Sequence, residues 1–298
     1  MRPDEWHLTE DVDDFLARAG DFLRSRPALH TMPLTVIEKL RTRRAHRADA
    51  SGAETTVFGR LERRGEVHAI FYRLPSRRLT LTALSPEQAD SLAAHLAGLG
   101  HSFSGVTADH DTATAFAKAW QRHTGAAPVR DWGARLHRLG TLTPQEPFPE
   151  GSGRVVGEQD REQVVRWCRE FCVDVGEDGS RDLIDAGDWA GSRFGDRHFT
   201  FWETPDGTPV SMAAATSMVG GMVRVDPVYT PARLRGRGYA GAVTVEASRA
   251  AVTAGATDVV LFADPANLTS TALYQRLGYI PLTDCTGYGF SSAAPEVG

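Results

Sequence analysis

The chain has 298 residues, 41% of them hydrophobic, and a formal net charge of -5. This length and composition suit two packed domains and exclude a mainly disordered chain. No apolar run approaches the roughly 18 residues that a membrane-spanning helix needs, and the acidic balance argues against a general nucleic-acid-binding protein. The N-terminal stretch is acidic and has no apolar core, so we expect no secretory signal.

Three cysteines, Cys168, Cys172 and Cys285, are too few for a disulfide framework. Cys168 and Cys172 lie four residues apart on a predicted helix, and no histidine pair accompanies them at zinc-site spacing. We therefore expect packing roles for them, no metal site and a cytoplasmic protein.

The first half of the chain predicts two helices, three strands, a helix, a strand, a helix and a strand. The third helix has a clear start, because Ser85 can cap it, Pro86 suits its first turn and Gln88 completes a capping box. In chain order the elements lie near 12–24, 34–44, 56–62, 67–72, 79–84, 85 onward, 103–106, 112–123 and 134–139.

Residues 143–153 are rich in proline and glycine and predict a linker between domains at 1–145 and 153–298. After a short strand, the second half predicts the same order of elements as the first. We therefore expect a structural duplication without a repeat of individual residues. In chain order the elements lie near 153–156, 159–173, 180–193, 199–203, 210–217, 222–229, 239–254, 259–263, 269–277 and 280.

The stretch most informative about function is 225–241, where a strand ends, a loop turns and a helix begins. Gly236 and Gly238 let backbone N–H groups approach an anion without obstruction from side chains. The start of the helix adds unpaired N–H groups and a positive dipole end, which suits a pyrophosphate. The loop also carries three basic side chains, Arg233, Arg235 and Arg237.

One pattern in this stretch is the dinucleotide fingerprint G-x-G-x-x-G, formed by Gly236, Gly238 and Gly241. Asp264 ends the next predicted strand, where a ribose-binding acid could lie. Three strands, predicted to be antiparallel, precede the loop, however, and too little sequence follows for a doubly wound sheet. This pattern therefore leaves an NAD(P)-dependent oxidoreductase as one alternative, and a second pattern in the same stretch indicates a different function.

The second pattern combines Arg233, Gly236 and Gly238, in the form Q/R-x-x-G-x-G/A, with an N-x-x-S-x-x-L-Y segment at 267–279. In this order the two motifs resemble the GCN5-related N-acetyltransferases (GNAT) over residues 153–290. The chain also looks like a bacterial subgroup with an additional N-terminal domain. The resemblance implies an α/β (α+β) class with tandem GNAT-like domains, each a mixed, mostly antiparallel central sheet flanked by helices.

The resemblance also implies the co-substrate and the reaction. Acetyl-CoA would bind along the end of the strand at 222–229 and in the glycine loop, and a primary amine would attack its thioester directly. The implied acetyl-CoA contacts are Val228, Tyr229, Thr230, Arg233, Arg235, Gly236, Arg237, Gly238, Tyr239, Ala240 and Asn267.

The catalytic roles follow from the same resemblance. Tyr274 lies where the family keeps the acid that protonates the departing thiolate, although it could also be a core aromatic. The general base is open between Asp226, Glu203 and a water relay. Asn267 could cap the following helix, contact the pantetheine arm, or do both.

The acceptor site is expected between the first two helices of the second half and the strand ends. An acidic pocket with aromatic residues there would suit a cationic small-molecule amine, whereas a solvated acidic helix face is the alternative. We expect no nucleic-acid or membrane partner, and a homodimer is possible. The residues concerned are Trp167, Glu170, Phe171, Asp174, Glu177, Asp178, Asp182, Asp185 and Asp188.

The first half lacks this chemistry at the equivalent place, because residues 84–88 contain neither a glycine pair nor an arginine. We therefore predict a degenerate copy that binds no acetyl-CoA and completes the core, shapes the acceptor pocket or forms a dimer interface. A module that senses acyl-CoA without turnover is the alternative to an enzyme.

Overall fold

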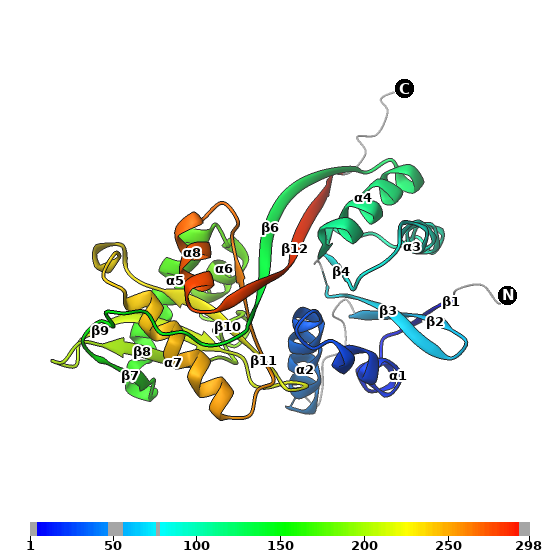
Figure 1. Ribbon diagram of the computed structural model, residues 1–298. Helices are drawn as coiled ribbons and strands as arrows, with labels where there is room; N and C mark the ends of the chain where they lie inside the picture. Colours follow the sequence, from blue (N-terminus) through cyan, green and yellow to red (C-terminus); the bar gives the residue numbers. More distant parts are fainter. Residues whose placement is uncertain (1–4, 47–55, 76–77, 292–298) are drawn as a thin grey trace, which may run out of the picture. The chain divides into compact units, whose positions relative to one another are not determined.

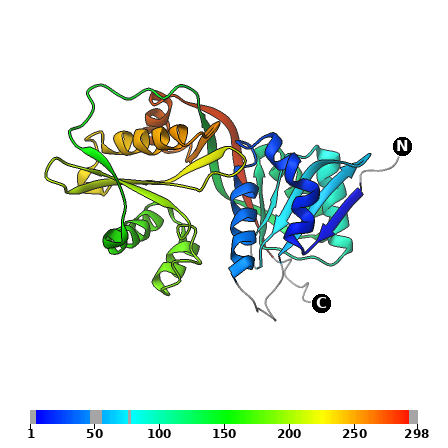
Figure 2. The same cartoon turned by 90° about the horizontal axis from the view of Figure 1, so that it is seen from below.

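The computed structural model describes residues 5–46, 56–75 and 78–291, and the side chains of all of these except 43–46. The chain divides into two compact units, drawn in Figures 1 and 2. Unit 1 contains Met1–Leu136 and Leu282–Gly298, and unit 2 contains His137–Pro281. Both units combine helices with a sheet of mixed strand direction, so the expected α/β class is confirmed.

Unit 1 is built on the strand order β1-β2-β3-β4-β5-β12. Its described strand pairs are antiparallel except for β4 and β5, which are parallel neighbours in the sheet. The helix α3 connects these two strands in the chain. The elements are β1 (Glu5–Thr9), α1 (Val12–Ser25), α2 (Thr31–His46), β2 (Val57–Arg63), β3 (Glu66–Arg73), β4 (Leu79–Leu81), α3 (Pro86–Gly98), β5 (Gly105–Asp109), α4 (His110–Thr124), and parts of β6 (Ala127–Leu139) and β12 (Tyr279–Ser291).

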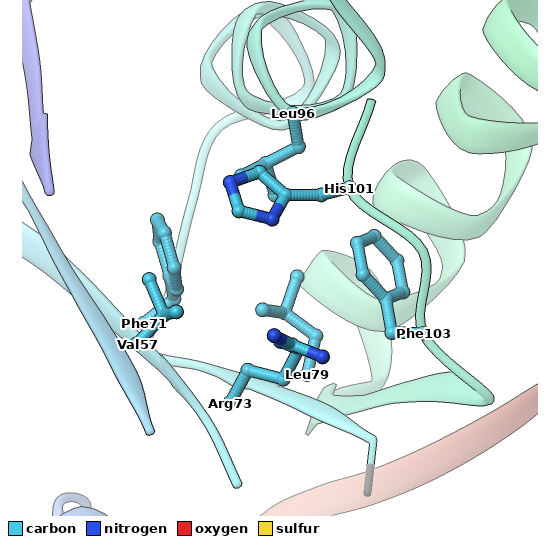
Figure 3. Close-up of a pocket in the computed structure, with 7 residues that line it drawn as sticks. All are labelled: Val57, Phe71, Arg73, Leu79, Leu96, His101 and Phe103. Carbon is cyan, nitrogen blue, oxygen red and sulfur yellow. The ribbon is translucent and has the colours of Figure 1, made fainter. Parts of the chain in front are cut away.

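Aromatic packing closes the core of unit 1, where Phe103 lies 4.3 Å from Trp120 between ring centroids and Phe116 stacks on the same ring. A small cavity borders this core, and Figure 3 shows Arg73 and His101 beside it among apolar side chains. Its volume of about 10 Å³ holds roughly one water molecule, far less than a nucleotide needs.

Unit 2 repeats this plan with the strand order β11-β10-β9-β8-β7. Here β10 and β11 form the parallel pair and are connected in the chain by α7, and the other described pairs are antiparallel. The elements are β7 (Ser152–Val155), η1 (Glu158–Asp160), α5 (Arg161–Val175), α6 (Asp178–Asp185), β8 (His198–Glu203), β9 (Pro209–Ala215), β10 (Met222–Tyr229), η2 (Ala232–Leu234), α7 (Tyr239–Thr253), β11 (Asp258–Ala263) and α8 (Leu268–Arg276).

Helices cover both faces of the sheet in unit 2, as Figure 2 shows for α7 in orange and α5 in green. Alternate residues of a strand point to opposite faces, and β8 illustrates this with Phe201 and Trp202. Phe201 packs with α5 and α6, whereas Trp202 packs with α7. The two faces therefore have separate hydrophobic clusters, and β10 lies between them.

The predicted duplication is present as an order of elements. In chain order, residues 5–139 and 152–291 each have two helices, three strands, a helix, a strand, a helix and a strand, as the sequence indicated, and each begins with one additional strand. The compact units differ from the division at 1–145 and 153–298, because residues 285–289 of β12 pair antiparallel with β5 in unit 1.

One predicted helix is shorter than expected. The helix near 180–193 ends at Asp185, because Gly187 adopts a left-handed φ of 79°. Asp188 then accepts a hydrogen bond from the backbone of Gly191 at 2.7 Å and holds a turn. The segment 186–197 is consequently a loop, and it supplies two arginines to the site described below.

Phe201 tests how far the cluster beneath α5 stabilises unit 2, since it is fully buried and lies 5.3 Å from Trp167. We expect Phe201→Ala to lower the free energy of unfolding by about 3–5 kcal/mol, through lost burial and the cavity left behind. Val155→Ala is the control, because Val155 is 78% exposed. Urea unfolding measures both, and equal stabilities of the two variants would contradict this account.

Candidate active site

The site begins at an irregularity in β10. Against β9, Val225 pairs with Ala215 and Val228 with Ala213, so β10 carries one extra residue in between. Pro227 lies in this bulge and has no N–H to donate to a ladder. On the other side of β10, the described pairs with β11 cover only residues 222–224 and 258–260. We call this place, where β10 bulges and its pairing with β11 ends, the split.

The loop beyond β10 leads directly into α7. Gly236 and Gly238 have φ values of 76° and 81°, in the left-handed region that favours glycine. A Cβ on Gly236 would meet no atom within 4 Å, so the requirement there is conformational rather than steric. Gly238 occupies the cap position of α7 and supplies no side-chain hydrogen bond. The first N–H groups of α7 are therefore available to an anion.

The three arginines of the loop divide into two kinds. Arg235 forms an ion pair with Asp174 of α5 and donates from Nε to the Thr230 carbonyl at 2.9 Å, so it braces the loop. Arg233 and Arg237 are exposed, and within the described residues neither has an ion-pair or hydrogen-bond partner. These two side chains are the ones free to reach a bound anion.

Backbone groups at the end of β10 are partly engaged. The Ser211 hydroxyl donates to the Tyr229 carbonyl at 3.0 Å and lies 2.8 Å from the Thr230 hydroxyl. The Tyr229 phenol donates to Glu170 at 2.8 Å, and burial together with that carboxylate raises its pKa. The end of the strand is therefore rigidly held against β9 and α5.

Tyr274 lies on α8 and is 8% exposed, packed in the cluster beneath α7. Its ring meets Tyr279 edge to face at 6.1 Å between centroids. Burial raises the pKa of the Tyr274 phenol, with smaller contributions from Tyr279 and from the Asp226 carboxylate. The phenol is therefore protonated at neutral pH, which a proton donor requires.

Asn267 caps α8, because its Oδ1 accepts a hydrogen bond from the backbone of Ser270 at 3.1 Å. The capping role considered from the sequence is thus present, and the residue is exposed. Asp264 also acts locally, since its side chain accepts from the backbone of Ala266 at 2.8 Å. Unit 2 has a single described parallel strand pair, so the doubly wound sheet of the NAD(P)-dependent alternative is absent from the described chain.

Asp226, a candidate base, lies at the bulge, with 17% of its side chain exposed. Burial opposes its charge, but Arg193, Arg197 and Arg224 overcome this and lower its pKa to about 2. Arg193 and Arg197 both form ion pairs with its carboxylate. A carboxylate so stabilised is a weak proton acceptor at neutral pH, so its geometry indicates charge balance rather than base catalysis.

Glu203, the other candidate base, lies away from the split. It ends β8, where it pairs with β7 and β9, and its carboxylate accepts from Arg154 Nε at 2.7 Å. The structure therefore places Asp226 in the bulge of β10 and leaves Glu203 two strands away, on β8.

The acidic surface of α5 and α6 is largely neutralised by arginines. The pairs join Asp174 to Arg235, Glu177 to Arg193, Asp178 and Asp182 to Arg181, and Asp185 to Arg169. Glu170 accepts from Tyr229, and Asp188 accepts from the turn after α6. The acids expected to attract a cationic amine are thus engaged within the protein.

Arg193 and Arg197 were not identified from the sequence. They lie in a segment expected to be partly helical, and no motif marks them. Their spacing of four residues in a glycine-rich acidic stretch was the only available signal.

Within the described ranges 5–46, 56–75 and 78–291, no group of three or more histidine, cysteine or acidic side chains is arranged to hold a metal ion. None of the helices in the same ranges is both long and apolar enough to cross a membrane.

The charge of Asp226 makes stability depend on pH. Its folded-state pKa is depressed, so its contribution is present above the unfolded pKa of about 4 and is lost as pH falls through about 2. We expect the difference in unfolding free energy between the wild type and Asp226→Asn to shrink by about 2 kcal/mol over that range. Urea titrations at stepped pH measure it, and a difference independent of pH would contradict the assignment.

Comparisons with known proteins support the resemblance seen in the second half. Residues 161–279 match the model of the acetyltransferase (GNAT) family. A search of curated proteins gives no match.

Similarity to solved structures extends over nearly the whole chain, at identities that show the fold alone. A GCN5-related N-acetyltransferase from Sphaerobacter thermophilus has 17% identity and a TM-score of 0.53, covering 97% of this chain and 96% of that one. A tandem GNAT protein from the clavulanic acid biosynthesis pathway has 14% identity and a TM-score of 0.58, covering 98% and 100%. A GNAT-family acetyltransferase from Colwellia psychrerythraea has 10% identity and a TM-score of 0.58, covering 96% and 100%. Residues 161–279 of this chain therefore form a domain of the GNAT acetyltransferase family.

Proposed function

We propose that this protein is an acetyl-CoA-dependent N-acetyltransferase that acetylates a primary amine of a small molecule. The observation that carries the proposal is the start of α7, where a glycine cap, exposed amides and two unpaired arginines follow directly on the split in the sheet. This arrangement suits a pyrophosphate at the helix and an extended thioester arm along β10.

The residues fit acetyl-CoA in two regions. The amides at 236–240 would hold the pyrophosphate, and Arg233 and Arg237 would supply charge that no described acid neutralises. Arg235 would act indirectly, because its bonds to Asp174 and Thr230 fix the loop. Val228 and Asn267 would border the pantetheine arm on the two sides of the split.

The reaction requires four events: the acceptor ammonium loses a proton, its nitrogen attacks the thioester carbonyl, the oxyanion is stabilised, and the thiolate departs with a proton. Tyr274 would supply that last proton, and two features support this role: its phenol is neutral, and no described hydrogen bond engages its hydroxyl. An amide of the bulged strand would stabilise the oxyanion. Because Asp226 and Glu203 are both held by arginines, water-relayed deprotonation of the acceptor is favoured.

The proposal extends to unit 1, which would bind no acetyl-CoA. The cap of α3 is already satisfied: Ser85 Oγ accepts from the Gln88 amide at 3.3 Å, and Gln88 Oε1 accepts from the Ser85 amide at 3.0 Å. The equivalent helix in unit 2 has no such side-chain bonds at its glycine cap. One acetyl-CoA site per chain is therefore expected.

The anion site is tested by the double variant Arg233→Gln and Arg237→Gln. Loss of both charges should raise the Kd for acetyl-CoA about tenfold, because each charge-assisted hydrogen bond contributes modestly at an exposed site. Calorimetry measures the Kd and the stoichiometry together. Arg249→Gln is the matched control, since Arg249 is an exposed arginine on α7 paired to Glu246. Unchanged affinity in the double variant, or two sites per chain in the wild type, would contradict the proposal.

The proton donor is tested by Tyr274→Phe, which keeps the ring and removes the hydroxyl. We expect kcat to fall by about 10²–10⁴-fold while the Kd for acetyl-CoA stays nearly unchanged. Thiol release with an amine panel measures kcat, and calorimetry measures the Kd. Full turnover in Tyr274→Phe would exclude the role.

A further inference from the structure

The acceptor side of the split differs from the acidic pocket that its composition suggests. Each acid named on α5 and α6 is bonded within the protein, mostly to arginine. Most of these carboxylates already have a cationic partner, which reduces the negative charge available to a cationic acceptor. Near the split, the Arg197 guanidinium has a buried N–H with no hydrogen-bond acceptor among the described residues.

Arg193 and Arg197 both contact Asp226, but only Arg193 is saturated. Its guanidinium pairs with Asp226 and Glu177 and lies over two aromatic rings, with Phe171 and Phe194 at 5.8 and 5.3 Å from the ring centroids. Burial opposes its charge, and the two acids overcome this and raise its pKa. Arg193 is therefore fully engaged as a structural residue.

Arg197 has far less compensation. Its side chain is only 9% exposed, and its one described ion pair is to Asp226 at 3.5 Å. Its Nε is buried and makes no hydrogen bond among the described residues. Burial lowers the pKa of Arg197, and Asp226 and Asp196 only partly offset this. A buried guanidinium in this state is costly, and an added anion would relieve it.

The position of Arg197 places this deficit at the reacting centre. It contacts Asp226, which lies in the bulge of β10 where pairing with β11 ends. The same carboxylate acts electrostatically on the Tyr274 phenol. Tyr274 packs beneath α7, whereas Arg193 packs with the cluster beneath α5. Arg197 therefore reaches the bulge of β10 through the same carboxylate that holds Arg193.

We propose that Arg197 binds a carboxylate of the acceptor, so that the substrate is an amine that also carries a carboxylate, of the amino-acid class. The planar guanidinium matches a carboxylate in shape and in its pair of hydrogen bonds. Because Asp226 and Asp196 lie close by, a monoanion is accommodated with less repulsion than a dianionic phosphate. This inference rests on the proposed function and specifies its acceptor.

The experiment compares matched amines with and without the carboxylate. Acceptors are amino acids, their carboxamides, an aminoalkyl phosphate and a diamine. Thiol release from acetyl-CoA gives kcat/KM, corrected for the neutral fraction of each amine. We expect the wild type to favour the carboxylate member by about tenfold or more, mainly through KM. Preference for carboxamides, for the diamine or for the phosphate would overturn the inference.

Variants locate the preference. Arg197→Gln should abolish the discrimination between amino acid and carboxamide while the Kd for acetyl-CoA is retained, and Arg197→Lys should keep part of it. Arg249→Gln is the control with the same charge change, and it should discriminate as the wild type does. Undiminished discrimination between amino acid and carboxamide in a folded Arg197→Gln would refute the assignment. If Arg197→Gln fails to fold, the preference for carboxylates is compared between the wild type and Arg197→Lys instead, and an equal preference in the two would refute it.

Failure of the underlying function has a separate signature. If acetyl-CoA shows no binding by calorimetry and no amine releases thiol, the acetyltransferase proposal fails and this inference falls with it. If acetyl-CoA binds and amines react without regard to a carboxylate, only the inference about Arg197 is overturned.

Discussion

The end of pairing between β10 and β11 is the constraint on which the site depends. Two parallel strands that remained paired would consume the backbone groups that a substrate needs. The extra residue between Val225 and Val228, in a segment containing Pro227, makes β10 bulge against β9 just beyond the residues that pair with β11. Ser211 and Glu170 meanwhile tie the end of β10 to β9 and α5, so the strand separates from β11 without becoming loose. The β10 edge of the split is thus held in place by β9 and α5.

The two units show how one order of elements can carry different chemistry. In each, a helix joins the two strands of the parallel pair. The first N–H groups of that helix can be capped by side chains of the protein or can bind a ligand. Ser85 and Gln88 satisfy the start of α3 with side chains, whereas Gly238 leaves the start of α7 to an external partner. Capping by side chains favours stability, and an uncapped helix start favours an anion. This difference of a few residues separates the proposed binding unit from its copy.

Periodicity and glycine placement predicted the order of the elements in both units, because those signals are local. Gly236 and Gly238 marked the loop, and their positive φ values agree with that interpretation. Interactions between distant residues were not predictable. The end of α6 depends on Gly187 and Asp188 within a stretch that also favours a helix. The pairing of residues 285–289 with β5 joins the last strand to a strand of the first half, far away in the sequence. Arg193 and Arg197, which pair with Asp226, lie in the loop at 186–197 that follows α6. Because this loop was not predicted, Asp226 could be taken for a base from sequence alone.

The central claim is that the start of α7 holds the diphosphate and that the thioester then lies in the split. A crystal structure of the protein with coenzyme A tests this most directly. The account predicts diphosphate oxygens within hydrogen-bonding distance of the amides at 236–240, with the sulfur near the Tyr274 hydroxyl. Coenzyme A bound at the start of α3, or at any surface that leaves the glycine loop and the split empty, would contradict it.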